Sequence, residues 1–133
     1  MGIFGNKIQK QIDELKRQQS ELPMELAIAG KSFFQKEFNS SSWDGKPWKP
    51  RKDTKNKKHL LVGTTGDLRK SLQNSIRHAD WKYIEWGDDL YYAKYHNFGT
   101  RYIPARQFMG FSKKFLEMIK KKIEKSVSKM ARQ

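Results

Sequence analysis

The chain has no cysteine among its 133 residues and only three histidines. Disulfide bonds and thiolate metal ligands are therefore excluded, and three scattered histidines cannot replace them, so neither a structural zinc site nor another cofactor is expected. No apolar run approaches the roughly 20 residues of a membrane-spanning helix, and none resembles the core of a secretory signal. These absences predict a protein that is made and kept in a reducing cytoplasm, without a membrane partner.

Acidic residues are half as numerous as basic ones, with 14 Asp and Glu against 28 Lys and Arg, which gives a formal net charge of +14. This charge favours a polyanionic neighbour: nucleic acid, an anionic membrane face or an acidic protein wall. Apolar residues make up 36% of the chain. That content and the length fit one domain over residues 1–133 with a single modest core, and part of the chain should lie outside it.

No catalytic set of residues is present. Asp88 and Asp89 are adjacent and so point in different directions, which is more typical of helix capping than of paired acid and base catalysis. The glycine-rich residues 63–66 lack the Gly-Lys-Ser/Thr ending of a phosphate loop, and Asp67 would repel a phosphate. His96 is more typical of an interface or core histidine than of a general base. The sequence therefore predicts a protein that is not an enzyme.

Helices are predicted at both ends of the chain. Residues 7–39 carry an apolar stripe with helical period, but Pro23 interrupts it, so the segment is either two helices or one helix kinked near Leu22. Its polar first part makes residues 1–22 a candidate helical arm. Residues 112–131 predict a strongly basic helix with one apolar stripe.

Breakers and lysines between these helices predict a basic loop over residues 40–59. Its Trp43 and Trp48 are expected to dock onto another part of the protein, as large aromatic side chains in a polar loop commonly do. A short helix should begin near Gly66, capped by Thr64 and ending around residue 73, with Leu68 and Leu72 on one side.

Alternating side chains then predict a hairpin of strands at residues 75–78 and 81–86, with Ile76, Ile84 and Trp86 on the buried face. The next segment is aromatic: Tyr91, Tyr95 and Phe98 recur at helical spacing. Gly99 can take the left-handed conformation that closes a helix, and Pro104 keeps the following chain extended as a strand.

Together these elements predict an α+β fold. It has a small, mostly antiparallel sheet with packed helices, a long N-terminal helix and a basic C-terminal helix.

Two groups of basic residues are candidates for contact with DNA, one in the loop and one in the C-terminal helix. They are Lys46, Lys49, Arg51, Lys52, Lys55, Lys57 and Lys58, and Lys120, Lys121 and Lys122. Lysine predominates, and a lysine acts as a point charge rather than a bidentate fork, so the expected contact is with the DNA backbone, without sequence choice. For the helix, the alternative is a solvated surface beside the apolar stripe.

Three separated segments carry a family resemblance: Trp43–Pro50, Leu60–Ser71 with its Thr-Gly, Leu-Arg and Ser pattern, and Tyr92–Gly110. The third includes His96-Asn97-Phe98-Gly99 and Ile103-Pro104-Ala105-Arg106-Gln107-Phe108-Met109-Gly110. In this order the segments resemble the phage virion morphogenesis family, the tail-completion and neck proteins of tailed phages of the Mu and P2 kind. Gln107 departs from that pattern, because a proline is common at its position.

The resemblance implies a structural virion protein of the neck or tail, assembled in the host bacterial cytoplasm as a ring at the head-tail junction or the top of the tail. Six copies are expected, in contact with neighbouring connector and tail proteins and, through a positive inner wall, with packaged DNA. The residues expected at the subunit interface or the fold corner are Tyr92, Tyr95, His96, Phe98, Gly99, Pro104, Arg106 and Phe108. For each aromatic residue, core packing is the alternative.

The competing interpretation is a basic, sequence-nonspecific nucleic-acid-binding protein, in which the lysine groups are themselves the functional site. No RNA-binding aromatic motif and no recognition-helix pattern supports it.

Overall fold

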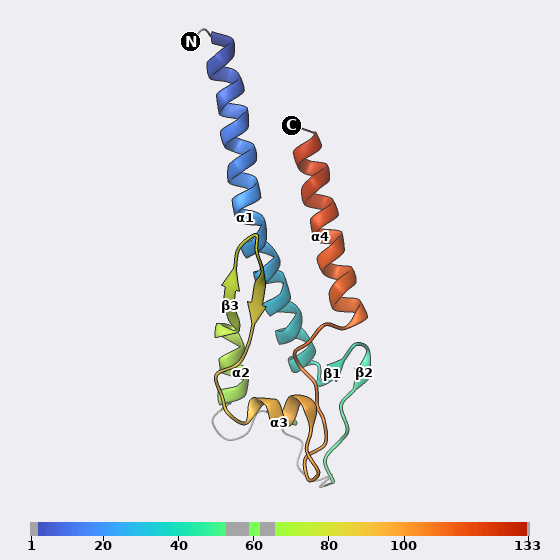
Figure 1. The fold of residues 1–133 in the computed structure, drawn as a ribbon. Helices are drawn as coiled ribbons and strands as arrows, with labels where there is room; N and C mark the ends of the chain where they lie inside the picture. The colour runs from blue at the N-terminus through green and yellow to red at the C-terminus, as the bar shows by residue number, and fades with distance from the viewer. Residues whose placement is uncertain (1–2, 53–58, 62–65, 133) are drawn as a thin grey trace.

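A computed structural model describes residues 3–52, 59–61 and 66–132. Its elements are α1 (Ile3–Asn39), β1 (Ser42–Trp43), β2 (Lys46–Pro47), α2 (Asp67–Ser71), the 3-10 helix η1 (Leu72–Asn74), β3 (Ile76–Ala79), β4 (Ile84–Trp86), α3 (Ala93–Phe98) and α4 (Lys113–Ala131). The predicted α+β fold is confirmed, with its strands divided between two separate antiparallel pairs. The short elements gather around the lower half of α1, and α4 rises beside it (Figure 1).

The N-terminal segment is one continuous helix with Pro23 inside it, so the interpretation as two helices is wrong. Pro23 leaves the carbonyl of Gln19 without its helical donor, and because Gln19 is exposed, water can take the donor's place. The two ends of α1 differ: residues 6–13 are all exposed, whereas Phe34 and Phe38 are fully buried. The second half of α1 is therefore the packed half.

The segment predicted as a plain loop at 40–59 contains a tight hairpin, β1–β2. Trp43 pairs with Lys46, and the two residues between them have positive φ, 51° at Asp44 and 82° at Gly45. These are the angles of the turn that Asp-Gly favours between antiparallel strands. The Asp-Gly dipeptide was thus an available signal for this hairpin.

Both tryptophans of this segment dock as predicted. Trp43 lies edge-on to Phe33 with ring centroids 6.0 Å apart. Trp48 is buried, and its ring lies 5.7 Å from that of Phe38. The main core joins this segment to α1, α2, α3 and the segment after α3 through Phe38, Trp48, Leu61, Leu68, Leu72, Ala93 and Phe108.

The second predicted hairpin is present as β3–β4, with Ile76 opposite Trp86. Its second strand begins at Ile84 rather than at Trp81, because the Asp80 carboxylate accepts hydrogen bonds from the backbone N–H groups of Lys82 and Tyr83 and holds them in the turn. The Trp86 indole donates a 2.9 Å hydrogen bond to the carbonyl of Ala27 and so fixes the hairpin on α1.

The short helix appears where it was predicted, as α2 followed by η1, with Leu68 and Leu72 buried. The residue at its N-cap is Gly66, with φ 67°, and Thr64 lies outside the described residues. Leu68 and Leu72 place this helix over the main core.

The predicted capping of α3 by two aspartates is wrong, since α3 has Tyr92 at its N-cap and no side-chain cap. Asp88 instead accepts hydrogen bonds from the Leu90 backbone N–H and the Ser71 hydroxyl, while Asp89 pairs with Arg77. These carboxylates tie the approach to α3 to α2 and β3.

The basic C-terminal helix is present as α4, and its N-cap Ser112 accepts a hydrogen bond from the Phe115 backbone N–H. The Phe115 ring stacks on Phe34 at 5.1 Å, which fastens the base of α4 to α1. Burial falls away along the helix, and Ile123 and Val127 are 39% and 52% exposed. Across the described ranges, none of the helices is long and apolar enough to cross a membrane.

Candidate functional site

The chain turns sharply where α3 ends, at Gly99. Its φ is 78° as predicted for a glycine cap, but its ψ of 168° lies outside the left-handed helical region that was expected. Nearly all residues that adopt this combination are glycines. A Cβ atom at this position would lie 2.8 Å from the backbone nitrogen of Ala105, so the turn also needs the missing side chain for space.

The segment after Gly99 forms no strand, contrary to the prediction. Side-chain and isolated backbone hydrogen bonds hold it instead. The Asn97 side-chain oxygen accepts hydrogen bonds from the backbone N–H groups of Phe108 (2.9 Å) and Met109 (3.1 Å), and the Arg106 N–H donates to the His96 carbonyl at 2.7 Å. Asn97 is therefore a buried residue that organises the corner.

The corner divides the predicted interface residues into buried and exposed ones. Phe108 is 1% exposed and belongs to the core, while Tyr92, His96, Gly99, Pro104 and Arg106 are partly buried. Burial, followed by the charges of Asp67 and Asp88, raises the pKa of Tyr92. Burial also lowers the pKa of His96, with the Arg106 charge as the second cause, so His96 is held neutral.

One aromatic surface remains open on α3. Phe98 is 73% exposed and Tyr95 40%, and Tyr91, just before the helix, is 80% exposed. We call these three residues the α3 surface. They line an open groove of about 460 Å³ whose floor includes Phe108 and Met109. This surface presents aromatic area of the kind that anchors protein interfaces.

A second groove, of about 660 Å³, lies where the basic segment after β2 meets the turn after Gly99, and we call it the basic groove. Figure 1 shows these two segments side by side at the end of the molecule opposite the N-terminus. The groove is lined by Lys49, Pro50, Arg51, Lys52, Thr100, Arg101, Tyr102, Ile103, Pro104 and Arg106. Five of these described residues are basic and none is acidic, so the groove is strongly electropositive.

Hydrogen bonds to backbone carbonyls hold the basic groove together. The Arg106 Nε donates to the carbonyl of Lys49 at 3.0 Å, and the Arg51 guanidinium donates to the carbonyl of His59, also at 3.0 Å. Burial lowers the pKa of Arg106, and the nearby Arg51 charge lowers it further. Two guanidinium groups are thus kept close together in one electropositive site.

The structure separates the basic residues that the sequence grouped as DNA contacts. Lys55, Lys57 and Lys58 lie outside the described residues. Lys46 is exposed on β2 and does not line the basic groove. Arg101, which was not predicted as a contact, does line it. Its position in the loop after Gly99 gave no signal for this role, because the loop meets the basic segment only in the folded protein.

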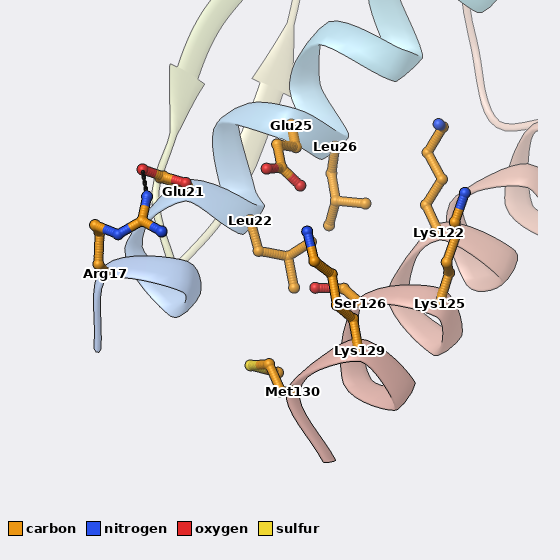
Figure 2. A pocket seen from close by; sticks show the side chains of 10 residues that line it. All are labelled: Arg17, Glu21, Leu22, Glu25, Leu26, Lys122, Lys125, Ser126, Lys129 and Met130. Carbon is orange, nitrogen blue, oxygen red and sulfur yellow. Dashed lines mark hydrogen bonds and ion pairs between the residues drawn. The ribbon is translucent and has the colours of Figure 1, made fainter. Parts of the chain in front are cut away.

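The lysines of α4 have different neighbours. Lys120 and Lys121 are exposed on its surface, and Lys122 lines a groove of about 310 Å³ between α1 and α4. Figure 2 shows Leu22 and Leu26 of α1 pointing toward α4, where Lys122, Lys125, Ser126, Lys129 and Met130 form the other wall. Glu21 and Glu25 line the α1 side. Lys122 thus shares its groove with two carboxylates as well as with other basic residues.

The two long helices also carry exposed apolar residues. Ile8 is 57% exposed on α1, and Ile12 and Leu15 are each 39% exposed. Ile123 and Val127 are exposed on α4, and we call Ile8, Ile12 and Leu15 of α1 the arm surface. Figure 1 places it at the opposite end of the molecule from α3.

Metal binding and acid-base chemistry each place requirements on the described residues. Among the described residues, no group of three or more His, Cys, Asp or Glu side chains is placed to hold a metal ion. His96 has no hydrogen-bonded acid: its buried Nδ1 lacks a hydrogen-bond partner in the described part of the chain. A general acid-base pair would need such a contact.

The chain matches the phage virion morphogenesis family over residues 4–128, which span α1, both hairpins, the corner and most of α4. Searches of curated proteins and of solved structures find no match to this chain. Since the family match covers nearly the whole chain, this protein belongs to the phage virion morphogenesis family and has a structural role in phage morphogenesis.

Proposed function

We propose that this protein is a virion component that assembles as a closed ring at the head-tail junction or the top of the tail. The observation that carries the proposal is the presence of two different exposed apolar surfaces, the α3 surface and the arm surface, at opposite ends of one small molecule (Figure 1). The proposed ring has six copies and contacts neighbouring connector and tail proteins. Family membership supports a virion role, and the two surfaces supply contacts that a ring requires.

A ring needs heterologous contacts, in which a surface on one copy meets a different surface on the next. A symmetric dimer needs only one self-complementary surface, so two unlike apolar surfaces favour the ring. Leaving Phe98 at 73% and Ile8 at 57% exposure is unfavourable for an isolated protein, because water covers apolar area that a neighbour could bury.

The arm surface has the pattern of a helix that packs against another helix. Ile8, Leu15 and Leu22 are seven residues apart, and Leu22 is buried against the rest of the protein, whereas the other two are not. The helical line that packs within the subunit therefore continues into the exposed half of α1. Residues 6–13 of α1 are all exposed, so tertiary packing within the subunit does not stabilise this stretch, and a neighbouring subunit would supply that packing.

A second candidate function is general nucleic-acid binding, which the basic groove favours. Its five basic residues make an electropositive site without any contribution from a neighbouring copy. That candidate leaves the α3 surface and the arm surface without a role, which is why we place it second.

The test is the oligomeric state of the wild-type protein and of two surface variants, measured by native mass spectrometry and by electron microscopy of purified particles. Tyr91→Ser with Phe98→Ser changes the α3 surface, and Ile8→Ser with Leu15→Ser changes the arm surface. Both pairs are exposed, so we expect each variant to fold and to lose the ring. Trp81→Ser, a 60% exposed aromatic residue in the β3–β4 turn, is the matched control and should assemble.

A wild-type chain that is a monomer both at high concentration and within purified particles would overturn the ring. Loss of assembly in the Trp81→Ser control to the same degree would show that the two surfaces have no special role. The copy number follows directly from the mass of the wild-type assembly.

A further inference from the structure

We propose that the basic groove is a binding site for the phosphate backbone of duplex DNA, with Arg101 and Arg106 from the corner acting together with Arg51. The site differs from the one that the sequence indicated, which extended over both lysine groups. The choice of DNA among polyanions rests on the proposed function, because a subunit at the head-tail junction or the top of the tail lies next to the packaged genome. Binding itself can be measured on the isolated chain, whether or not a ring forms.

The composition of the groove favours phosphate. Three of the chain's seven arginines line it, although lysines outnumber arginines three to one overall. A guanidinium presents paired donors that match two oxygens of one phosphate, which an ammonium group cannot do. The groove therefore offers guanidinium groups, whose paired donors suit a phosphate, where the sequence had indicated mainly lysines.

The hydrogen bonds of the groove orient these arginines. Because the Arg106 Nε is engaged by the Lys49 carbonyl, the stem of this side chain is fixed where the two walls meet. Arg101 is exposed, and its guanidinium lies 5.7 Å from the Tyr102 ring. Arg106 is thus anchored in the groove, and the exposed Arg101 is free to move toward a ligand. Such an arrangement suits contact with successive phosphates of a DNA backbone.

The charges around the groove also favour an anionic ligand. Arg51 and Arg106 line the same groove, and Arg51 is close enough for its charge to lower the pKa of Arg106, so both contribute positive potential to one site. The described lining residues are rich in arginine, which can contact either phosphate or guanine. We expect phosphate contacts to supply the affinity, and a comparison of unrelated duplexes tests whether the arginines also read bases.

The α4 lysines are not part of this site. Lys122 lines the groove between α1 and α4 together with Glu21 and Glu25, and Lys120 pairs with Glu124 at 4.0 Å. None of these residues lines the basic groove. Lys121, exposed on α4, therefore provides a matched control for charge changes in the groove.

The experiment is a fluorescence-anisotropy titration of the full chain with two unrelated DNA duplexes of equal length at about 50 and 200 mM salt. If about four phosphates are neutralised, affinity should fall about 100-fold between these salt concentrations, equally for both duplexes. Arg101→Glu should weaken binding by at least about tenfold and flatten the salt dependence, since phosphate contacts set that slope. Lys121→Glu, with the same change in net charge, should weaken it by only about twofold, as expected for a distant screened charge.

Arg106→Lys provides a second variant, because it keeps the charge and removes the guanidinium fork. We expect an affinity between those of the wild type and Arg101→Glu, and only a small fall in thermal stability from loss of the Nε hydrogen bond to the Lys49 carbonyl. Equal effects of Arg101→Glu and Lys121→Glu would overturn the assignment to the groove. Nanomolar, sequence-selective binding at the higher salt would overturn the backbone mode. The choice of duplex DNA would also be overturned if Arg101→Glu weakened binding to an acidic peptide or to single-stranded RNA but left binding to the duplex unchanged.

Assembly is measured separately on the same Arg101→Glu protein. A ring that forms without DNA binding would separate the two functions and support the groove assignment. Loss of the ring with DNA binding intact would place Arg101 at a subunit contact and overturn the proposal for the groove while leaving the ring itself standing.

Discussion

The indole Nε1 of Trp48 donates a 2.7 Å hydrogen bond to the backbone carbonyl of Gln107, although 59 positions separate the two residues in the chain. This bond joins the segment after the β1–β2 hairpin to the segment after α3. Both belong to the parts of the sequence that carry the family resemblance. They also form the two walls of the basic groove, so the bond lies directly behind the proposed binding site.

Trp48→Phe removes this bond and keeps an aromatic ring in the core. We expect a loss of about 1–3 kcal/mol in the free energy of unfolding, because the change leaves a hydrogen-bonding group unpaired near a buried site and also shrinks the side chain. Urea denaturation measures it. Trp81→Phe, at an exposed position, is the control and should stay within about 0.5 kcal/mol of the wild type. A loss for Trp48→Phe no greater than in this control would mean that the bond contributes nothing.

Gly99→Ala tests the corner. The added Cβ would lie 2.8 Å from the Ala105 nitrogen and 3.1 Å from the Ile103 carbonyl oxygen, at a φ of 78° that side chains rarely adopt. Both effects disfavour the fold. We expect Gly99→Ala to lower the free energy of unfolding by at least about 3 kcal/mol, and Gly99→Val to lower it further. Thermal unfolding of both variants provides the measurement. A melting temperature of Gly99→Val equal to that of the wild type would show that residue 99 does not adopt this tight turn.

Asn97→Leu tests the buried polar residue of the corner. The Asn97 oxygen accepts hydrogen bonds from two backbone N–H groups, those of Phe108 and Met109. Leucine has nearly the same volume and no acceptor, so it leaves both donors unsatisfied, at a cost of about 1–3 kcal/mol each. Denaturation with urea gives the value, and Asn74→Leu on an exposed site is the control. A stability equal to the control's would indicate that water or a shifted backbone satisfies both donors.

His59 makes stability depend on pH. Burial is the main cause that lowers the pKa of His59 below its ordinary value of 6.5; the hydrogen bond to the Phe38 carbonyl opposes this, and the charges of Arg69 and Arg51 add to it. Its Nδ1 accepts from the Leu61 N–H while its Nε2 lies 2.6 Å from the Phe38 carbonyl, an arrangement that suits the neutral ring. Protonation of His59 at Nδ1 would place its new hydrogen against the hydrogen of the Leu61 N–H and break this bond.

The unfolded chain therefore binds a proton at His59 at a higher pH than the folded chain does. The resulting stability is fully present above pH 6.5 and is lost as the pH falls through the lower folded pKa. The free energy of unfolding should decline from pH 7 toward about pH 5, and more gently in His59→Gln, which cannot titrate. Urea titrations at several pH values test this. An identical slope in both proteins would exclude His59 as the source.

Much of the fold followed from the sequence because its signals are local. The Leu68 and Leu72 pair predicted the short helix, the alternation around Ile76 and Trp86 predicted a hairpin, and the stripe after Ser112 predicted α4. The Asp44-Gly45 turn carries an equally local signal for the β1–β2 hairpin inside the lysine-rich loop. The aspartates before α3 led to a wrong cap because their partners, Ser71 and Arg77, lie in other elements.

The candidate site divides in the same way. Sequence spacing indicated a short aromatic helix that ends at a glycine, because side-chain direction repeats with the helical period. That helix is α3, which contains Tyr95 and Phe98, whereas Tyr91 lies just before it. Only the tertiary structure decided that these rings stay exposed while Phe108 is buried, since burial depends on which segments cover a residue. It also decided that Arg101 and Arg106 meet Arg51 across one groove, because segments some 50 positions apart come together only when the core closes between them.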